Sequence, residues 1–108
     1  MDGTRLVFLK QVQNSPAGQK VRFLGYVQSY DNGILRLQDE SSIVECDLAA
    51  VLGNLKIQIR EWLDIVGRKC SDGKIDVLLV RSVVGMDLPK YRKTLQWRQE
   101  LESEWNRF

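Results

Sequence analysis

The chain of 108 residues contains no histidine. Catalysis by a nucleophile that a histidine activates is therefore excluded. The two cysteines, Cys46 and Cys70, lack the CxxC spacing of a zinc or redox site, and with so few ligands we expect no metal and no cofactor. Two free thiols are typical of a reducing compartment. A phosphate-binding glycine loop is also missing, and we interpret the chain as a non-enzyme.

Long apolar runs and strong charge are missing as well. No stretch approaches the roughly eighteen apolar residues that span a membrane, and residues 1–4 lack the basic-then-apolar plan of a signal peptide. The net charge of +2 permits contact with nucleic acid but excludes a polycation that coats phosphate. With 44% hydrophobic and 28% charged residues, the composition predicts one globular domain over residues 1–108.

The stretch from residue 18 to residue 40 predicts a bent strand and a hairpin. Val21, Phe23 and Val27 alternate with polar residues, which is the period of a strand with one buried face. Gly25 interrupts this strand, and a strand glycine usually marks a bend or bulge. Asp31-Asn32-Gly33 then predicts a tight turn, because Asn and Gly tolerate a positive φ. A long bent strand that folds directly into a second strand is typical of a small Greek-key barrel of the OB type.

Three further strands are predicted over residues 43–48, 62–69 and 75–84. The first of them places Val44, Cys46 and Leu48 on its buried side. The last is apolar on both sides around Leu78-Leu79-Val80, which predicts a strand covered on both faces.

We expect residues 1–19 to form a lead-in, residues 20–84 the barrel and residues 87–108 a C-terminal helix, which Asp87 can cap. The lead-in fits either an extended segment or a helix, and the pattern of residues 5–13 does not decide between them. The predicted fold class is all-β with a C-terminal helix, that is, a single OB fold with a five-stranded Greek-key barrel.

The C-terminal helix carries two apolar stripes. At 100° per residue, one stripe of Leu88, Tyr91 and Leu95 lies about 110° from a second stripe of Trp97, Leu101, Trp105 and Phe108. One stripe can cover the barrel, but the second has no obvious partner in so short a chain. Because Trp and Tyr are enriched at interface cores, we favour a protein interface over a helix that only wraps its own barrel.

A polar and aromatic surface is predicted on the outer face of the first two strands, formed by Arg22, Tyr26, Tyr30 and Arg36. OB folds bind single-stranded nucleic acid or sugars on such a face, with aromatic rings stacking on bases and cations following phosphates. A solvated face, or tyrosines covered by the terminal segments, is the alternative. Further basic groups could extend the path, namely Lys20, Arg68, Lys69 and Arg81. Because both bordering turns are short, binding by the chain alone should be weak.

Three segments stand in one order along the chain: GQKVRFLGYVQSYD at residues 18–31, WLDIVGR at residues 62–68 and DLPKYRKTL at residues 87–95. They resemble the first strand, the fourth strand and the opening of the C-terminal helix of the Ten-one family, the smallest subunit of the telomeric CST complex. The resemblance covers nearly the whole chain and is closest to fission-yeast-like members.

The resemblance implies a single OB fold that pairs with the N-terminal OB fold of Stn-one, largely through C-terminal helices. Such a pair protects chromosome ends in the nucleus, regulates telomere replication and assists binding of single-stranded G-rich telomeric DNA. The implied partner contacts are Leu88, Tyr91 and Leu95, to which helical periodicity adds Trp97, Leu101 and Trp105. The implied DNA contacts are Arg22, Tyr26, Tyr30 and Arg36.

Two alternative functions share the same barrel. One is the smallest subunit of replication protein A, which would act at every replication fork. The other is a stand-alone OB module that binds single-stranded nucleic acid or sugar without a protein partner.

Overall fold

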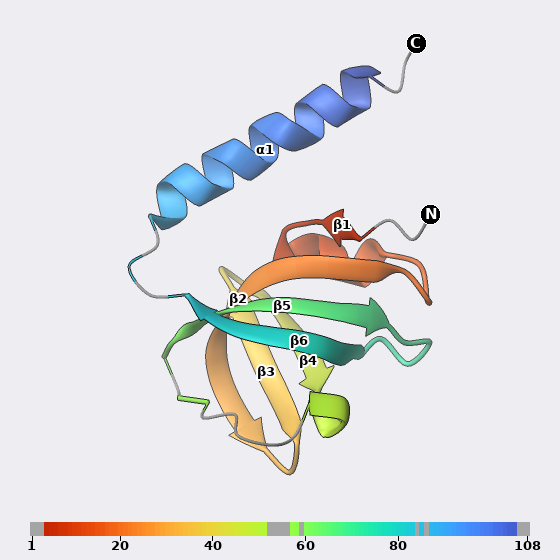
Figure 1. The fold of residues 1–108 in the computed structure, drawn as a ribbon, viewed down its shortest axis with the longest axis vertical. Helices are drawn as coiled ribbons and strands as arrows, with labels where there is room; N and C mark the ends of the chain where they lie inside the picture. Colours follow the sequence, from red (N-terminus) through yellow and green to blue (C-terminus); the bar gives the residue numbers. More distant parts are fainter. Residues whose placement is uncertain (1–3, 52–56, 59, 84, 86, 106–108) are drawn as a thin grey trace.

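The computed structural model describes residues 4–51, 57–58, 60–83, 85 and 87–105, with only the backbone of Ala50, Glu104 and Trp105 (Figure 1). The elements in chain order are β1 (Arg5–Leu6), η1 (Leu9–Asn14), β2 (Lys20–Asp31), β3 (Ile34–Asp39), β4 (Ser42–Asp47), η2 (Ala49–Val51), β5 (Trp62–Lys69), β6 (Ile75–Val83) and α1 (Leu88–Trp105). The strands β2 to β6 form a barrel, and α1 lies outside it on the side of β1 and η1 (Figure 1). Among the described helices, none is both long and apolar enough to cross a membrane.

Strand β2 closes the barrel because it pairs with two other barrel strands, β5 and β3. Its first half, Lys20–Tyr26, is antiparallel to β5, and its second half, Tyr26–Asp31, is antiparallel to β3. Strand β1 lies parallel to β2. The circuit is completed by the antiparallel pairs β3–β4 and β5–β6 and by the parallel pair β4–β6. This circuit is the five-stranded Greek-key barrel that the sequence predicts, with β1 added at its side.

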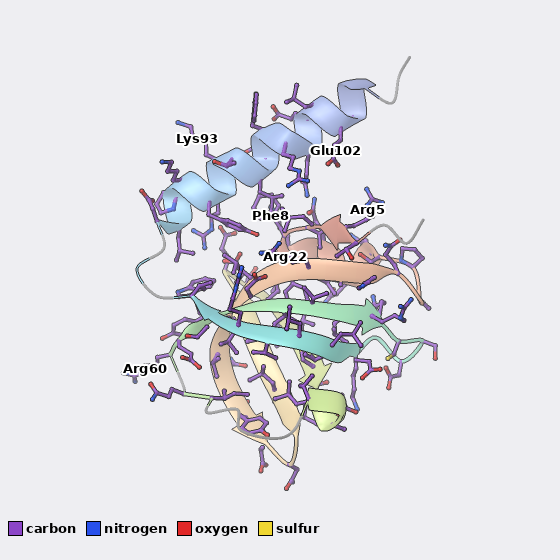
Figure 2. All side chains as sticks on the ribbon, in the orientation of Figure 1. Arg5, Phe8, Arg22, Arg60, Lys93 and Glu102 are labelled. Carbon is purple, nitrogen blue, oxygen red and sulfur yellow. The ribbon has the colours of Figure 1, made fainter. Side chains whose placement is uncertain are left out.

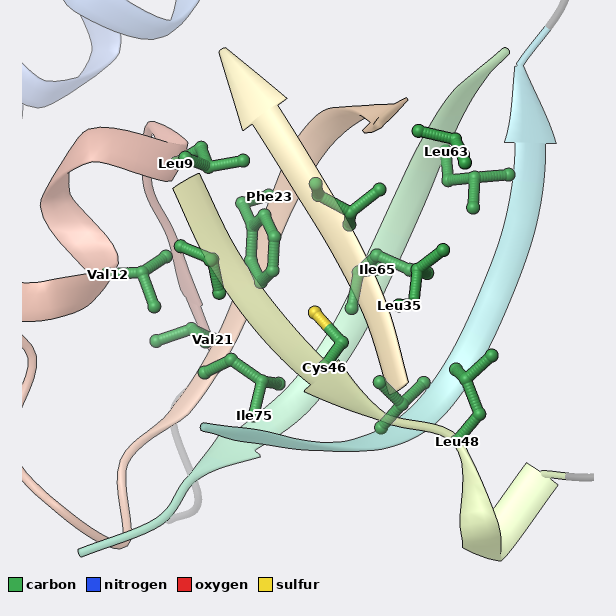
Figure 3. Packing of buried hydrophobic residues seen from close by; sticks show 14 of the residues in the cluster. Leu9, Val12, Val21, Phe23, Leu35, Cys46, Leu48, Leu63, Ile65 and Ile75 are labelled. Carbon is green, nitrogen blue, oxygen red and sulfur yellow. The ribbon is translucent and has the colours of Figure 1, made fainter. Parts of the chain in front are cut away.

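The barrel interior is filled by the residues that the strand alternation places inside. Val21, Phe23 and Val27 of β2 are fully buried there. Cys46 points into the same core (Figure 3), and this burial raises the pKa of its thiol to about 12. Cys46 is therefore a neutral, small core residue at physiological pH.

The lead-in is both extended and helical, so each of the two alternatives is correct for part of it. The extended part is β1, and the helical part is the 3-10 helix η1, whose Leu9 and Val12 are fully buried. The C-terminal end of η1 is capped from β5. There the Lys69 ammonium group donates hydrogen bonds to the carbonyl oxygens of Val12 at 2.8 Å, Gln13 at 3.1 Å and Ser15 at 3.4 Å. Lys69 is therefore a buried structural cation, and its assignment to a DNA path is wrong.

Replacing Lys69 with Met is expected to lower the free energy of unfolding by about 2 kcal/mol, because hydrogen bonds from a charged donor contribute roughly 1.5–3 kcal/mol net. Methionine keeps most of the buried stem but leaves the three carbonyl oxygens at the end of η1 without this donor. Urea denaturation measures the change. The control is Lys90→Met at an exposed position of α1, which should change stability by less than about 0.5 kcal/mol. Equal stability of the two variants would contradict a capping role.

Strand β6 differs from its prediction as a strand covered on both faces. Leu78 is 42% exposed and Leu79 is 58% exposed. The β5–β6 ladder shifts register between Val66 and Gly67, so one extra residue of β6 is accommodated there. An apolar sequence on both sides of a strand therefore does not show that both sides are buried. The sequence also alternates apolar and polar residues over 55–60, just before β5, and half of these residues lie outside the described ones.

Two glycines mark close approaches between neighbouring strands. A Cβ atom on Gly25 would lie 2.7 Å from the Leu37 Cβ atom and 2.9 Å from the Leu9 Cδ1 atom. The bulge that Gly25 suggested lies instead between Val27 and Ser29 of the β2–β3 ladder. Gly67 faces β6 in the same way, as a Cβ atom there would lie 2.7 Å from the Asp76 carbonyl oxygen.

The β2–β3 turn has the geometry expected from its sequence. Asn32 has a φ of 52° and Gly33 a φ of 78°, the positive values that a two-residue hairpin requires. The start of α1 also agrees with its prediction, since the Asp87 carboxylate accepts a hydrogen bond from the Lys90 backbone N–H at 3.1 Å.

Candidate functional site

Helix α1 is fastened to the rest of the chain by polar contacts along one side. The Arg92 guanidinium group donates to the Asp39 carboxylate at the end of β3, at 2.7 Å. Two turns further on, the Gln99 amide group donates to the Gln11 side chain at 2.9 Å and to the Leu6 carbonyl oxygen at 3.4 Å. Figure 2 shows the side chain of Phe8 between α1 and the barrel and that of Lys93 on the opposite side of the helix.

The stripe of Leu88, Tyr91 and Leu95 faces the barrel. Leu95 is only 2% exposed, and Leu88 and Tyr91 are half-buried. Helical spacing places these three residues on the same face of α1 as Arg92 and Gln99, whose hydrogen bonds hold that face against the barrel. The prediction that Leu95 contacts a partner is therefore wrong, because this chain already buries the Leu95 side chain.

The second stripe is exposed. Trp97 is 62% exposed and Leu101 is 45% exposed, one helical turn apart on the side of α1 that faces away from the barrel. The side chain of Trp105 falls outside the described residues. An exposed tryptophan beside an exposed leucine on one helix face is an apolar patch that a second molecule can cover.

A groove of about 700 Å³ lies between the C-terminal half of α1 and the lead-in. Its lining is mostly polar and includes Arg5, Gln11, Arg98, Gln99 and Glu102. In the C-terminal half of the helix, the polar contacts of Gln99 with Leu6 and Gln11 are thus bordered by this groove.

The N-terminal part of α1 lies beside a buried carboxylate that two arginines share. Arg22 of β2 donates to Asp64 of β5 at 2.7, 3.1 and 3.2 Å, and Arg81 of β6 donates to the same carboxylate at 3.0 Å. The hydrogen bonds to Asp64 raise the pKa of Arg22. Burial raises the pKa of Tyr91, and the negative charge of Asp64 raises it further. Sequence reasoning missed Asp64, because its partners come from strands that are distant in the sequence.

Of the four predicted DNA contacts, Arg22 and Tyr26 share the outer face of β2, where β5 pairs with this strand. Tyr26 packs against Trp62 of β5, with ring centroids 5.5 Å apart and ring planes at 60°. Both rings are half-buried. Trp62 is a second residue that sequence reasoning missed, although its place two residues before Asp64 puts it on the same face of β5.

The other two predicted DNA contacts lie elsewhere. Because of the bulge at Gln28, Tyr30 is directly opposite the buried Leu35 and not on the side of Arg36. Arg36 is on the outer face of β3 and donates to Glu45 of β4 at 3.4 Å. The four residues therefore do not form one continuous surface, and the expectation that they share a face is corrected.

The described part of the chain offers no group of three or more His, Cys, Asp or Glu side chains that could hold a metal ion. Its candidate sites are therefore surfaces: an apolar helix face, and a sheet face with arginines and aromatic rings.

Comparison with known proteins identifies the family. Residues 2–96 match the family Ten1, described as telomere capping, CST complex subunit. The chain belongs to the Ten1 family. It is 55% identical to protein ten1 of Schizosaccharomyces pombe over 102 residues, which cover 94% of this chain and 100% of that protein. The resemblance drawn from the three sequence segments is thus confirmed, and with it the interpretation as a telomere-capping subunit.

Solved structures agree with this family assignment. A chain of the S. pombe Stn1–ten1 complex is 56% identical, with a TM-score of 0.88 over 92% of this chain and 94% of that chain. A chain of U. maydis replication protein A bound to ssDNA has a TM-score of 0.76 but only 18% identity, covering 95% of each chain. The second likeness is one of fold and supports the OB architecture. Members of the Ten1 family are binding subunits. The part of this chain that matches the family ends at residue 96, just before Trp97.

Proposed function

We propose that this chain caps telomeres as the small subunit of a heterodimer with a Stn1-type OB-fold protein. It acts in the nucleus at chromosome ends, assists the binding of single-stranded G-rich telomeric DNA and has no enzymatic activity. The observation that carries the proposal is the 56% identity to a chain of the S. pombe Stn1–ten1 complex. We treat residues 1–108 as one OB-fold domain, in which the lead-in and the C-terminal helix flank the barrel.

The exposed stripe of α1 supports a protein partner. Trp97 is a large, rigid side chain of the type that dominates binding energy at interface centres, and Leu101 adds apolar area beside it. The contacts of Arg92 and Gln99 hold the helix in place before the partner arrives, which lowers the entropy cost of binding. Helical periodicity adds Trp105 to the same interface, with Leu88 and Tyr91 at its edge.

The charge of the chain supports only a modest share in DNA binding. A net charge of +2 and short hairpin turns leave room for two to four phosphate contacts. The slope of log affinity against log salt for single-stranded DNA should then be about −1.4 to −2.8 for the chain alone. The partner therefore supplies most of the affinity of the heterodimer.

Reconstitution with defined partners tests the proposed function. The purified chain is mixed in turn with the Stn1-type protein and with the large subunit of replication protein A from the same organism. Size-exclusion chromatography with light scattering then measures which pair forms. We expect a 1:1 complex with the Stn1-type protein, and this complex should bind a single-stranded G-rich telomeric oligonucleotide more tightly than the small chain does.

Two other results would overturn the proposal. A complex with the replication protein A subunit alone would assign the chain to general replication. A monomer that ignores both partners and binds single-stranded nucleic acid tightly, with a salt slope steeper than about −3, would indicate a stand-alone OB module.

A further inference from the structure

The outer face of β2, β5 and β6 collects more positive charge than any other sheet face that the described residues form. Cross-strand neighbours share this face, so the ladders place four basic and two acidic side chains on it: Lys20, Arg22, Arg68, Arg81, Asp64 and Asp76. The outer face of β3 and β4 instead carries one basic and two acidic side chains: Arg36, Glu45 and Asp47. OB folds commonly bind oligonucleotides on this second face. Here its charge opposes such binding, and its arginine is already paired with Glu45.

Two of the basic groups on the β2–β5–β6 face are fixed in position. The Asp64 side chain is 9% exposed and accepts hydrogen bonds from both Arg22 and Arg81, whose side chains are 44% and 65% exposed. One carboxylate thus neutralises only one of two guanidinium groups. Arg81 contacts Asp64 through its Nη2 atom, and its side chain is the more exposed of the two. A held guanidinium loses little conformational freedom when it binds a phosphate.

Aromatic and apolar side chains lie beside these cations. The ladders place the Tyr26–Trp62 pair in the row next to Asp64 and Arg81, and Leu79 in the row on the other side. Leu79 is the more exposed of the two β6 leucines. Single-stranded nucleic acid can use both kinds of side chain. Its bases stack on the aromatic rings and apolar groups, while its phosphates contact the fixed cations.

We propose that single-stranded nucleic acid binds across the β2–β5–β6 face, with a base on the Tyr26–Trp62 pair and phosphates at Arg81 and Arg22. This inference rests on the proposed function, because it locates the DNA contact of the heterodimer. It moves that contact away from Tyr30 and Arg36 and onto Trp62 and Arg81, which lie beside Tyr26 and Arg22 on this face.

The test uses the reconstituted heterodimer with the Stn1-type partner and a fluorescent single-stranded G-rich telomeric oligonucleotide. Trp62→Leu should raise the dissociation constant about fivefold, which is the lower end of the effect of losing one stacked base. Arg81→Gln should also raise the dissociation constant about fivefold, because a phosphate contact is lost. Arg81→Gln should also reduce the magnitude of the salt slope by about 0.7, the share of one phosphate contact. The matched controls Arg36→Gln and Tyr30→Leu should change the dissociation constant less than twofold.

A second readout guards against loss of fold in the Trp62 variant. Ultraviolet crosslinking of the wild-type heterodimer to the oligonucleotide should place the modified peptides in β2 and β5, while thermal melting checks each variant. The inference is overturned if the control variants weaken binding and Arg81→Gln does not, or if crosslinks fall in β3 and β4. It is also overturned if Arg81→Gln and Trp62→Leu weaken heterodimer formation instead, which would make this face a protein interface. A heterodimer that forms but binds no DNA would contradict the DNA part of the proposed function itself.

Discussion

A chain in which Trp97 and Leu101 are both replaced by Glu is expected to bind the Stn1-type partner at least about 1000-fold more weakly than the wild type. Each side chain is exposed in the free chain and offers apolar area at the centre of the proposed interface. Interface hot spots contribute 2 kcal/mol or more each, and roughly 4 kcal/mol corresponds to three orders of magnitude in the dissociation constant. The two new carboxylates would additionally be buried without a partner. Isothermal titration calorimetry with the purified partner measures the loss.

The control for this double variant adds the same two carboxylates elsewhere on α1. Gln96→Glu with Ser103→Glu changes exposed positions outside the stripe and should leave the dissociation constant within about threefold of the wild-type value. Both chains should melt at the wild-type temperature when alone, because neither changes a buried residue. Tight binding by a folded Trp97/Leu101 variant would rule out this face of α1 as the interface.

A different outcome is expected at Leu95, on the side of the helix that faces the barrel. Leu95→Glu places a carboxylate where this chain buries its own side chain, so the melting temperature of the isolated chain should fall. A lower melting temperature without a partner distinguishes a residue that holds α1 to the barrel from one that contacts a second protein.

Replacement of Gly67 by Val is expected to lower the free energy of unfolding by about 3 kcal/mol or more. A Cβ atom at this position would overlap the side chain of Ile75 and would lie 2.7 Å from the Asp76 carbonyl oxygen. Backbone atoms of a paired strand cannot move aside as the end of a flexible side chain can, so the β5–β6 ladder must separate. For a domain of this size, the melting temperature should fall by more than about 10 °C, which circular dichroism measures.

The control for Gly67 is its neighbour Val66, which points to the outer face of β5 and is only partly buried. Val66→Ile adds a methylene group at this partly exposed position, and the stability should change by less than about 0.5 kcal/mol. A Gly67→Val variant as stable as this control would mean that β5 and β6 lie further apart at Gly67 than they do in this structure.

The features that could be predicted from the sequence are those that depend on local residue order. The alternation of Val21, Phe23 and Val27, the Asn32-Gly33 turn and the Asp87 cap each follow from a few adjacent residues, and the structure agrees with all of them. The family also followed from local segments. The alternation of apolar residues, the residue types in a turn and the capping of a helix each depend on a short stretch of chain. They can therefore be predicted from one sequence without knowledge of distant contacts.

The features that could not be predicted depend on which distant strands meet. A bulge at Gln28 moves Tyr30 to the other side of the sheet, and the alternation alone gives no sign of this extra residue. Both helix stripes are apolar in sequence, and only the folded chain, through the burial of Leu95 and the contacts with Asp39 and Gln11, shows which of them faces the barrel. Trp62 joins Tyr26 solely because β5 pairs with β2. The four predicted DNA contacts therefore do not form one surface, and Leu95 of the predicted interface is buried within this chain.

The closure of the barrel by β2 also determines when the chain can fold. The β2–β5 ladder joins Lys20 to Arg68 and Tyr26 to Trp62, so β3, β4 and their connections separate the partners in the sequence. Such non-local pairing slows folding, because the loop entropy is lost before the ladder is gained. During synthesis, the first half of β2 has an unpaired edge until β5 leaves the ribosome, and an open edge can pair with other chains. We therefore expect the yield of soluble subunit to depend on the rate of this pairing step, so that variants which slow it aggregate more even where the finished barrel is stable.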